Sequence, residues 1–125
     1  MNREIKFRGQ QINTKKWVYG YLYRNKGLYV ICENIRYAEE EPILLDTVGQ
    51  YTGLDDKNGT EIYEGDIVGD NKIKWIVKWN KHRMGFSLYP TTKQLYDEMP
   101  INVENKLGFK ILGNIYDNPE LLGGE

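Results

Sequence analysis

The alternation of apolar and polar residues predicts a chain that consists mainly of β-strands. It is clearest between residues 72 and 80, in the segment KIKWIVKWN. One face of this segment would be wholly apolar, with Ile73, Trp75, Val77 and Trp79. The other face would be mostly lysine, with Lys72, Lys74, Ile76 and Lys78. A repeat of two residues is typical of a strand with one buried face. We therefore expect a strand here whose apolar face joins the core.

Three strands are predicted in the first third of the chain. Ile5 and Phe7 alternate with charged residues, and strand character returns in the segments 17–23 and 28–32. Residues 25–27, Asn-Lys-Gly, separate the last two segments and suit a tight turn. Consecutive strands joined in this way predict an N-terminal β-meander.

Four aromatic residues recur at every second position of the segment 17–23, so they would share one face of its strand. They are Trp17, Tyr19, Tyr21 and Tyr23. Such a row could stack the bases of a single-stranded nucleic acid. It could also pack across strands inside the core of a sheet. We favour core packing, because no cluster of functional side chains accompanies the row in the sequence.

The segment 49–68, GQYTGLDDKNGTEIYEGDIV, holds the densest set of turn signals. Asn58-Gly59 is a dipeptide preferred in type I′ hairpin turns, which need positive φ at both central residues. Gly65 interrupts the apolar pattern, and an interior glycine marks a bulge or a bend. We expect a structural bend at Gly65-Asp66, followed by a new strand. The Gly-Asp-x-Val pattern at its start is common in SH3-like barrels, which favours a barrel-like C-terminal half.

The remaining segments predict further strands and little helix. Strand patterns occupy residues 85–89 and 109–116, and a short helix could form between 91 and 99. Asn118 followed by Pro119 suits the start of a single helical turn. The predicted fold class is therefore mainly β, with a meander followed by an SH3-like, barrel-like half.

A single domain covering residues 1–125 is expected, which could divide into two β sub-lobes of about 1–63 and 64–125. The length suffices for one domain with a real core. Alanine occurs once, at Ala38, whereas tyrosine occurs ten times, and this composition favours sheet over helix.

Charge and hydropathy limit the environment in which the protein would act. The formal net charge of −1 gives no global electrostatic reason for DNA or membrane binding. No apolar run is long enough to span a bilayer, and the start, MNREIKFRG, lacks the apolar core of a signal peptide. We therefore expect a soluble, cytoplasmic protein with no membrane partner.

The charges are unevenly distributed along the chain. Residues 1–26 hold seven lysines and arginines against the single acid Glu4, whereas residues 33–66 are strongly acidic. This asymmetry could guide self-association or partner docking, or the two segments could neutralise each other within one fold. The sequence leaves the oligomeric state open.

A basic segment follows, and its residues are the best candidates for nucleic-acid or partner contact: Lys72, Lys74, Lys78, Lys81 and Arg83. Lysines at strand spacing could meet phosphates. Lysines on an exposed edge also prevent sheets from aggregating, and this structural role is the commoner one.

No catalytic, cofactor-binding or metal-binding motif is found. Aligning Asn58-Gly59 with a calcium-binding loop places Leu54 and Gly65 where the two anchoring carboxylates belong, which excludes that site. Cys32 follows an apolar run and predicts a buried thiol, and the single histidine, His82, lies in a basic loop. An enzyme would need carboxylates such as Glu64 and Asp66 to converge in a pocket. We therefore expect no enzymatic activity, metal or cofactor.

Three segments resemble the YopX family of phage and prophage proteins. They are the opening REIKFRG, the central GQYTGLDDKNGTEIYEGDIV and the closing ILGNIYDNPELL, so the resemblance covers essentially the whole chain. It implies a small β-rich protein encoded by a bacteriophage or an integrated element, with no established biochemical activity and no catalytic residues.

These observations favour a non-enzymatic binding or adaptor protein that acts on a protein partner in a bacterial host cell. The partner surface could use aromatic residues of the meander or the acidic segment 39–66. The alternative is an SH3-like nucleic-acid-binding module that uses the basic segment from Lys72 to Arg83.

Overall fold

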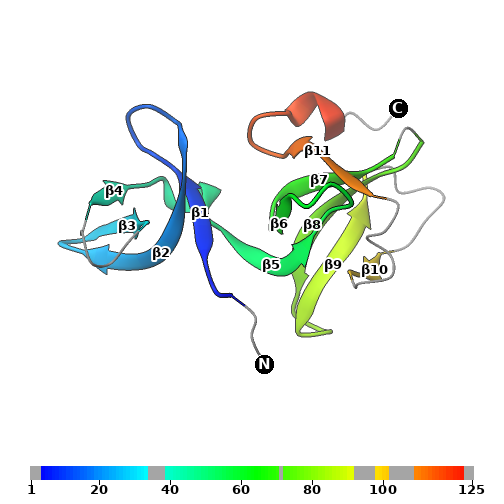
Figure 1. The fold of residues 1–125 in the computed structure, drawn as a ribbon, viewed down its shortest axis with the longest axis horizontal. Helices are drawn as coiled ribbons and strands as arrows, with labels where there is room; N and C mark the ends of the chain where they lie inside the picture. Colours follow the sequence, from blue (N-terminus) through cyan, green and yellow to red (C-terminus); the bar gives the residue numbers. More distant parts are fainter. Residues whose placement is uncertain (1–3, 34–38, 71, 92–97, 102–108, 123–125) are drawn as a thin grey trace. The chain divides into compact units, whose positions relative to one another are not determined.

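The computed structural model describes residues 4–33, 39–70, 72–91, 98–101 and 109–122 and confirms a mainly β protein (Figure 1). The chain forms two compact units, Met1–Tyr51 and Thr52–Glu125. The division lies within strand β5 (Gly49–Asp55), whereas the sequence placed a division near residues 63 and 64. Each unit has buried apolar side chains of its own.

The first unit is an antiparallel meander. Its elements are β1 (Phe7–Gln10), β2 (Trp17–Asn25), β3 (Leu28–Cys32), β4 (Glu40–Pro42), the 3-10 helix η1 (Leu45–Thr47) and the start of β5. The strand order is β4-β3-β2-β1-β5. Lys26 and Gly27 both have positive φ, 54° and 83°, as the tight turn between β2 and β3 requires. The meander expected from the alternation is therefore present.

The buried side chains of the first unit lie mainly on β3 and just after β4. Val30, Ile31, Cys32 and Ile43 are all nearly inaccessible to solvent. An isolated bridge joins Gln11 to Ile43, and the Leu44 amide donates to the Gln10 carbonyl at 2.9 Å. These contacts bring the ends of the meander together without closing it into a barrel.

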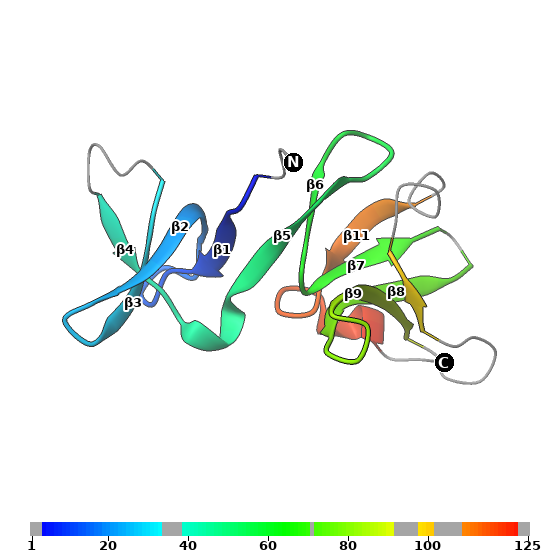
Figure 2. The same ribbon diagram turned by 90° about the horizontal axis from the view of Figure 1, so that it is seen from below.

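The second unit contains a five-stranded antiparallel sheet (Figure 2). Its elements are the end of β5, β6 (Glu61–Tyr63), β7 (Asp66–Gly69), β8 (Lys74–Asn80), β9 (Gly85–Pro90), β10 (Met99–Pro100), β11 (Lys110–Asn114) and the 3-10 helix η3 (Pro119–Leu122). The order of the sheet is β10-β9-β8-β7-β11, and β6 pairs with β5. Among the described residues neither sheet closes, so the predicted SH3-like barrel is not observed.

The core of the second unit forms where four of its strands meet. Ile62 from β6 packs with four residues of the sheet, Val68, Trp75, Val77 and Leu88. Burial of each such side chain stabilises the fold by about 1.5–3 kcal/mol. The period of two in β8 thus places Trp75 and Val77 in the core, as predicted.

The loop between β5 and β6 differs from the predicted type I′ turn. It spans residues 56–60, and Gly59 has a φ of 85°, whereas Asn58 is not among the residues with positive φ. Asp56 organises this loop: its Oδ1 accepts hydrogen bonds from the amides of Asn58 and Thr60, both at 2.9 Å. Its Oδ2 accepts from the Ile111 amide at 3.0 Å, which ties the loop to β11.

The chain bends sharply between β6 and β7, at Gly65-Asp66. Gly65 has a φ of 95°, and its amide donates to the Val77 carbonyl at 2.8 Å. Asp66 is buried, and its Oδ2 accepts a hydrogen bond from the Tyr63 amide at 2.7 Å. The structure therefore gives this glycine and this carboxylate roles in shaping the backbone.

The helical content is limited to 3-10 turns in the described residues. The final predicted strand, 109–116, is observed as β11, and one helical turn follows as η3. The short helix expected between 91 and 99 falls largely outside the described residues. Within those residues, no helix has the length and apolar character needed to cross a membrane.

Candidate binding surfaces

The aromatic row of β2 lies on the surface of the first unit. Tyr19, Tyr21 and Tyr23 are 44%, 49% and 36% exposed, and Trp17 is half-buried. The prediction that this row packs in the core is therefore wrong. The other face of β2 packs inward, because Gly20 lets the strand approach β3 closely: a Cβ there would lie 2.3 Å from the Cys32 carbonyl oxygen.

A hydrogen bond network fixes one end of the aromatic row. The Tyr23 hydroxyl donates to Glu40 Oε2, and Asn25 Nδ2 donates to Glu40 Oε1 at 2.7 Å. The hydrogen bond to Glu40, followed by desolvation, raises the pKa of Tyr23 to about 12. The same bond, assisted by Asn25, lowers the pKa of Glu40 below its usual value. Near neutral pH the pair is a neutral phenol held by an ionised carboxylate.

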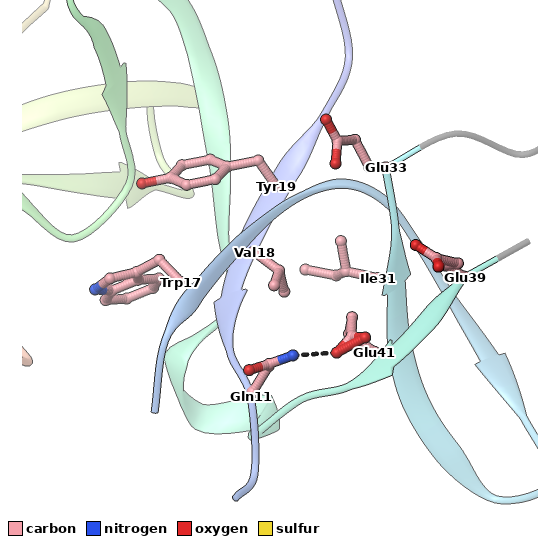
Figure 3. Close-up of a pocket in the computed structure, with 8 residues that line it drawn as sticks. All are labelled: Gln11, Trp17, Val18, Tyr19, Ile31, Glu33, Glu39 and Glu41. Atoms are coloured by element: carbon pink, nitrogen blue, oxygen red, sulfur yellow. Dashed lines mark hydrogen bonds between the residues drawn. The ribbon is translucent and has the colours of Figure 1, made fainter. Parts of the chain in front are cut away.

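A hollow of about 1040 Å³ lies in the same unit (Figure 3). Its lining includes three carboxylates, Glu33, Glu39 and Glu41, and Gln11 Nε2 donates to Glu41 Oε1. Figure 3 shows Trp17 and Tyr19 projecting from the side of β2 opposite to Val18. Trp17 and Tyr19 are nonetheless among the residues that line the hollow, so the hollow adjoins the exposed aromatic row of β2.

The predicted basic segment is spread over a strand and two turns of the second unit. Lys72 lies in the turn before β8, where Asp70 Oδ1 accepts from the amides of residues 72 and 73. These backbone hydrogen bonds lower the pKa of Asp70. Lys74 is half-buried on β8, whereas Lys78 and Lys81 are exposed. The five predicted residues thus do not form a single row.

Arg83 is held by a carboxylate of the same unit. Its Nη2 and Nε donate to Glu98 Oε1 at 2.8 and 2.9 Å. This contact lowers the pKa of Glu98 and raises that of Arg83. The charge of Arg83 is therefore largely compensated by Glu98.

Trp79 is a surface residue that the sequence interpretation missed. The alternation placed it on the buried face with Trp75 and Val77, yet it is 50% exposed. The Phe86 ring on β9 packs edge-on against it, with ring centroids 5.3 Å apart and an interplanar angle of 81°. Met84, in the turn between β8 and β9, is 78% exposed. The position of Trp79 next to the basic turn was the feature of the sequence that could have indicated its exposure.

The residues considered for catalysis are dispersed or structural. Cys32 is buried on β3 of the first unit, and His82 lies in an exposed turn of the second. Asp66 is engaged with the backbone, as described above. In the described part of the chain, no group of three or more His, Cys, Asp or Glu side chains is arranged to hold a metal ion.

Two antiparallel sheets with almost no helix define an all-β protein that presents exposed aromatic residues. The chain belongs to the YopX family, because the family model described as YopX protein matches residues 6–123.

The fold is similar to that in the crystal structure of protein EF1440 from Enterococcus faecalis. The two sequences are 23% identical, the TM-score is 0.58, and the match covers 97% of this chain and 99% of the other. At this identity the similarity concerns the fold alone. No curated protein matches the chain.

Proposed function

We propose that this YopX-family chain is a non-enzymatic binding or adaptor protein that docks onto a protein partner through the tyrosine face of β2. The observation that carries this proposal is the exposure of Tyr19, Tyr21 and Tyr23 at alternate positions of one strand. The family resemblance supports a role inside a bacterial host cell during phage or prophage life.

Tyrosine suits such a surface for a physical reason. Its ring buries apolar area on binding, while its hydroxyl keeps a hydrogen bond, and tyrosine is enriched at interfaces and among their most important residues. The β2 face is also held in place, since Tyr23 is anchored to Glu40. An ordered aromatic surface loses little conformational entropy when a partner binds.

The proposal is tested by affinity capture from induced host cells with the wild type and two variants. Tyr21→Ala removes an exposed ring from the tyrosine face, and Leu45→Ala removes a side chain of similar exposure, 52%, from η1 of the same unit. A partner captured by the wild type should be lost or weakened with Tyr21→Ala, by about 1 kcal/mol or more, and retained with Leu45→Ala. Equal capture by both variants would refute the role of this face.

A second candidate function is nucleic-acid binding by the basic segment of the second unit. It is supported by the exposure of Lys78 and Lys81 and by the half-exposed Trp79, which precedes the turn that holds Lys81. Binding of this kind should weaken steeply as salt rises, because it releases condensed counterions. The absence of binding to both single-stranded and duplex probes at low salt would exclude it.

A further inference from the structure

The end of the β8–β9 hairpin combines exposed apolar and basic side chains. This surface, called the hairpin tip below, consists of Trp79, Lys81, His82 and Met84, and all four are exposed. We propose that the hairpin tip binds single-stranded nucleic acid by stacking an unpaired base on Trp79. This inference rests on the second candidate function and identifies the form of nucleic acid that the site would take.

The Trp79 side chain packs against a neighbouring ring although the residue is 50% exposed. Phe86 supports it from the neighbouring strand at 5.3 Å, in an edge-to-face arrangement. The two residues are direct cross-strand partners in the β8–β9 pairing, so the backbone register keeps them together. A fixed and exposed indole is a suitable surface for a nucleobase, because every base presents a π-face.

The charges around Trp79 favour an anionic ligand. Lys81 is exposed in the turn that follows Trp79, whereas Lys78 lies on the opposite face of β8, with its Nζ 5.6 Å from the centre of the Tyr89 ring. Arg83 is engaged by Glu98 and is not expected to contribute a phosphate contact. One lysine in contact with a single strand predicts that the logarithm of the binding constant falls with the logarithm of the salt concentration with a slope of about −0.7.

Met84 extends the apolar part of the hairpin tip. It is 78% exposed and has a φ of 56°, a conformation that is uncommon for a residue with a bulky side chain. A positive φ at a residue with a side chain of this size is a local strain, and such strain clusters at functional sites. The side chain lies in the same turn as Lys81, where it would contact a sugar or a second base.

A single strand fits the hairpin tip better than a duplex. In a duplex the faces of the bases are covered by stacking, so Trp79 would have no surface to contact and only Lys81 would bind. In a single strand the bases are accessible, and stacking on one aromatic ring adds to the phosphate contacts. The predicted signature is therefore a preference for single strands that depends on the Trp79 ring.

The test compares a fluorescently labelled oligothymidine with a duplex of the same length at low salt, by anisotropy. Trp79→Ala should weaken single-strand binding by about fivefold or more and leave duplex binding nearly unchanged. Trp79→Phe, which keeps a ring beside Phe86, should retain part of the preference. Lys81→Gln should reduce the salt slope by about 0.7 without changing the preference.

Leu45→Ala serves as the control, since it removes a side chain of similar exposure, 52%, from the other unit. Thermal unfolding of each variant separates a lost contact from a lost fold. If wild type binds neither probe, nucleic-acid binding itself is refuted. If wild type binds both probes equally and Trp79→Ala has no effect, or if it binds only anionic lipid vesicles, the single-strand inference is refuted.

Discussion

Removal of the Asp56 carboxylate should destabilise the second unit strongly. Asp56 is buried and accepts hydrogen bonds from the amides of Asn58, Thr60 and Ile111. Hydrogen bonds to a charged group are worth about 1.5–3 kcal/mol each, and the partly exposed loop reduces this to about 1 kcal/mol per bond. We therefore expect Asp56→Ala to lower the free energy of unfolding by about 3 kcal/mol.

The size of this effect can be measured by urea and thermal denaturation monitored by circular dichroism. A loss of about 3 kcal/mol in a unit of this size corresponds to a decrease in Tm of roughly 12–24 °C. Asp56→Asn keeps one carbonyl oxygen, so it can preserve the bonds to Asn58 and Thr60 while losing the bond to Ile111. Its destabilisation should fall between that of Asp56→Ala and that of a surface control.

Asp46→Ala provides this control, because Asp46 is exposed in η1, and it should change the stability by less than about 0.5 kcal/mol. The reasoning would be refuted if Asp56→Ala cost less than 1 kcal/mol, or if Asp56→Asn were as damaging as alanine. Either result would mean that the carboxylate does not organise the loop of residues 56–60.

Two further predictions concern the first unit. Gly20→Ala should lower the free energy of unfolding by at least about 2 kcal/mol, because its Cβ would lie 2.3 Å from the Cys32 carbonyl oxygen at a φ of 153°. The control is Gly85→Ala, whose Cβ would have its nearest neighbour at 3.9 Å, and thermal unfolding compares the two variants. Glu40→Gln should move the pKa of Tyr23 from about 12 toward 10.0 in an ultraviolet titration, and an unchanged titration would contradict the hydrogen bond. Since this pKa is raised in the folded state, the stabilisation by the Tyr23–Glu40 bond is present below pH 10 and is lost as the pH rises through 12. The lowered pKa of Glu40 has the opposite consequence, a contribution that is lost on acidification.

Local alternation predicted where strands form, but not where the core ends. In β8 the apolar face is buried at Trp75 and Val77 and emerges into solvent at Trp79. The period of two is a property of the backbone and continues to the end of the strand, whereas burial depends on what packs against it. Nothing in the segment KIKWIVKWN itself indicates that the neighbouring elements stop covering β8 before residue 79.

The aromatic row of β2 shows that alternation also does not indicate which of the two faces of a strand is buried. Both faces carry residues that could be buried, and volume alone favours the face with Trp17 and the tyrosines. Gly20 reverses this expectation, because the absence of a side chain allows the Cys32 backbone to approach that position. A glycine within a strand is therefore evidence that its own face is the closely packed one.

Charge along the sequence overstated the acidity of the surface. Two acids of the segment 33–66, Asp56 and Asp66, are buried and satisfy backbone amides instead of facing solvent. On the basic side, Arg83 is compensated by Glu98. Some of the charged residues thus stabilise the loops of the fold, whereas Tyr21 and Trp79 are each about half exposed. For this reason Tyr21 and Trp79 identify the two candidate binding surfaces more specifically than the distribution of charge does.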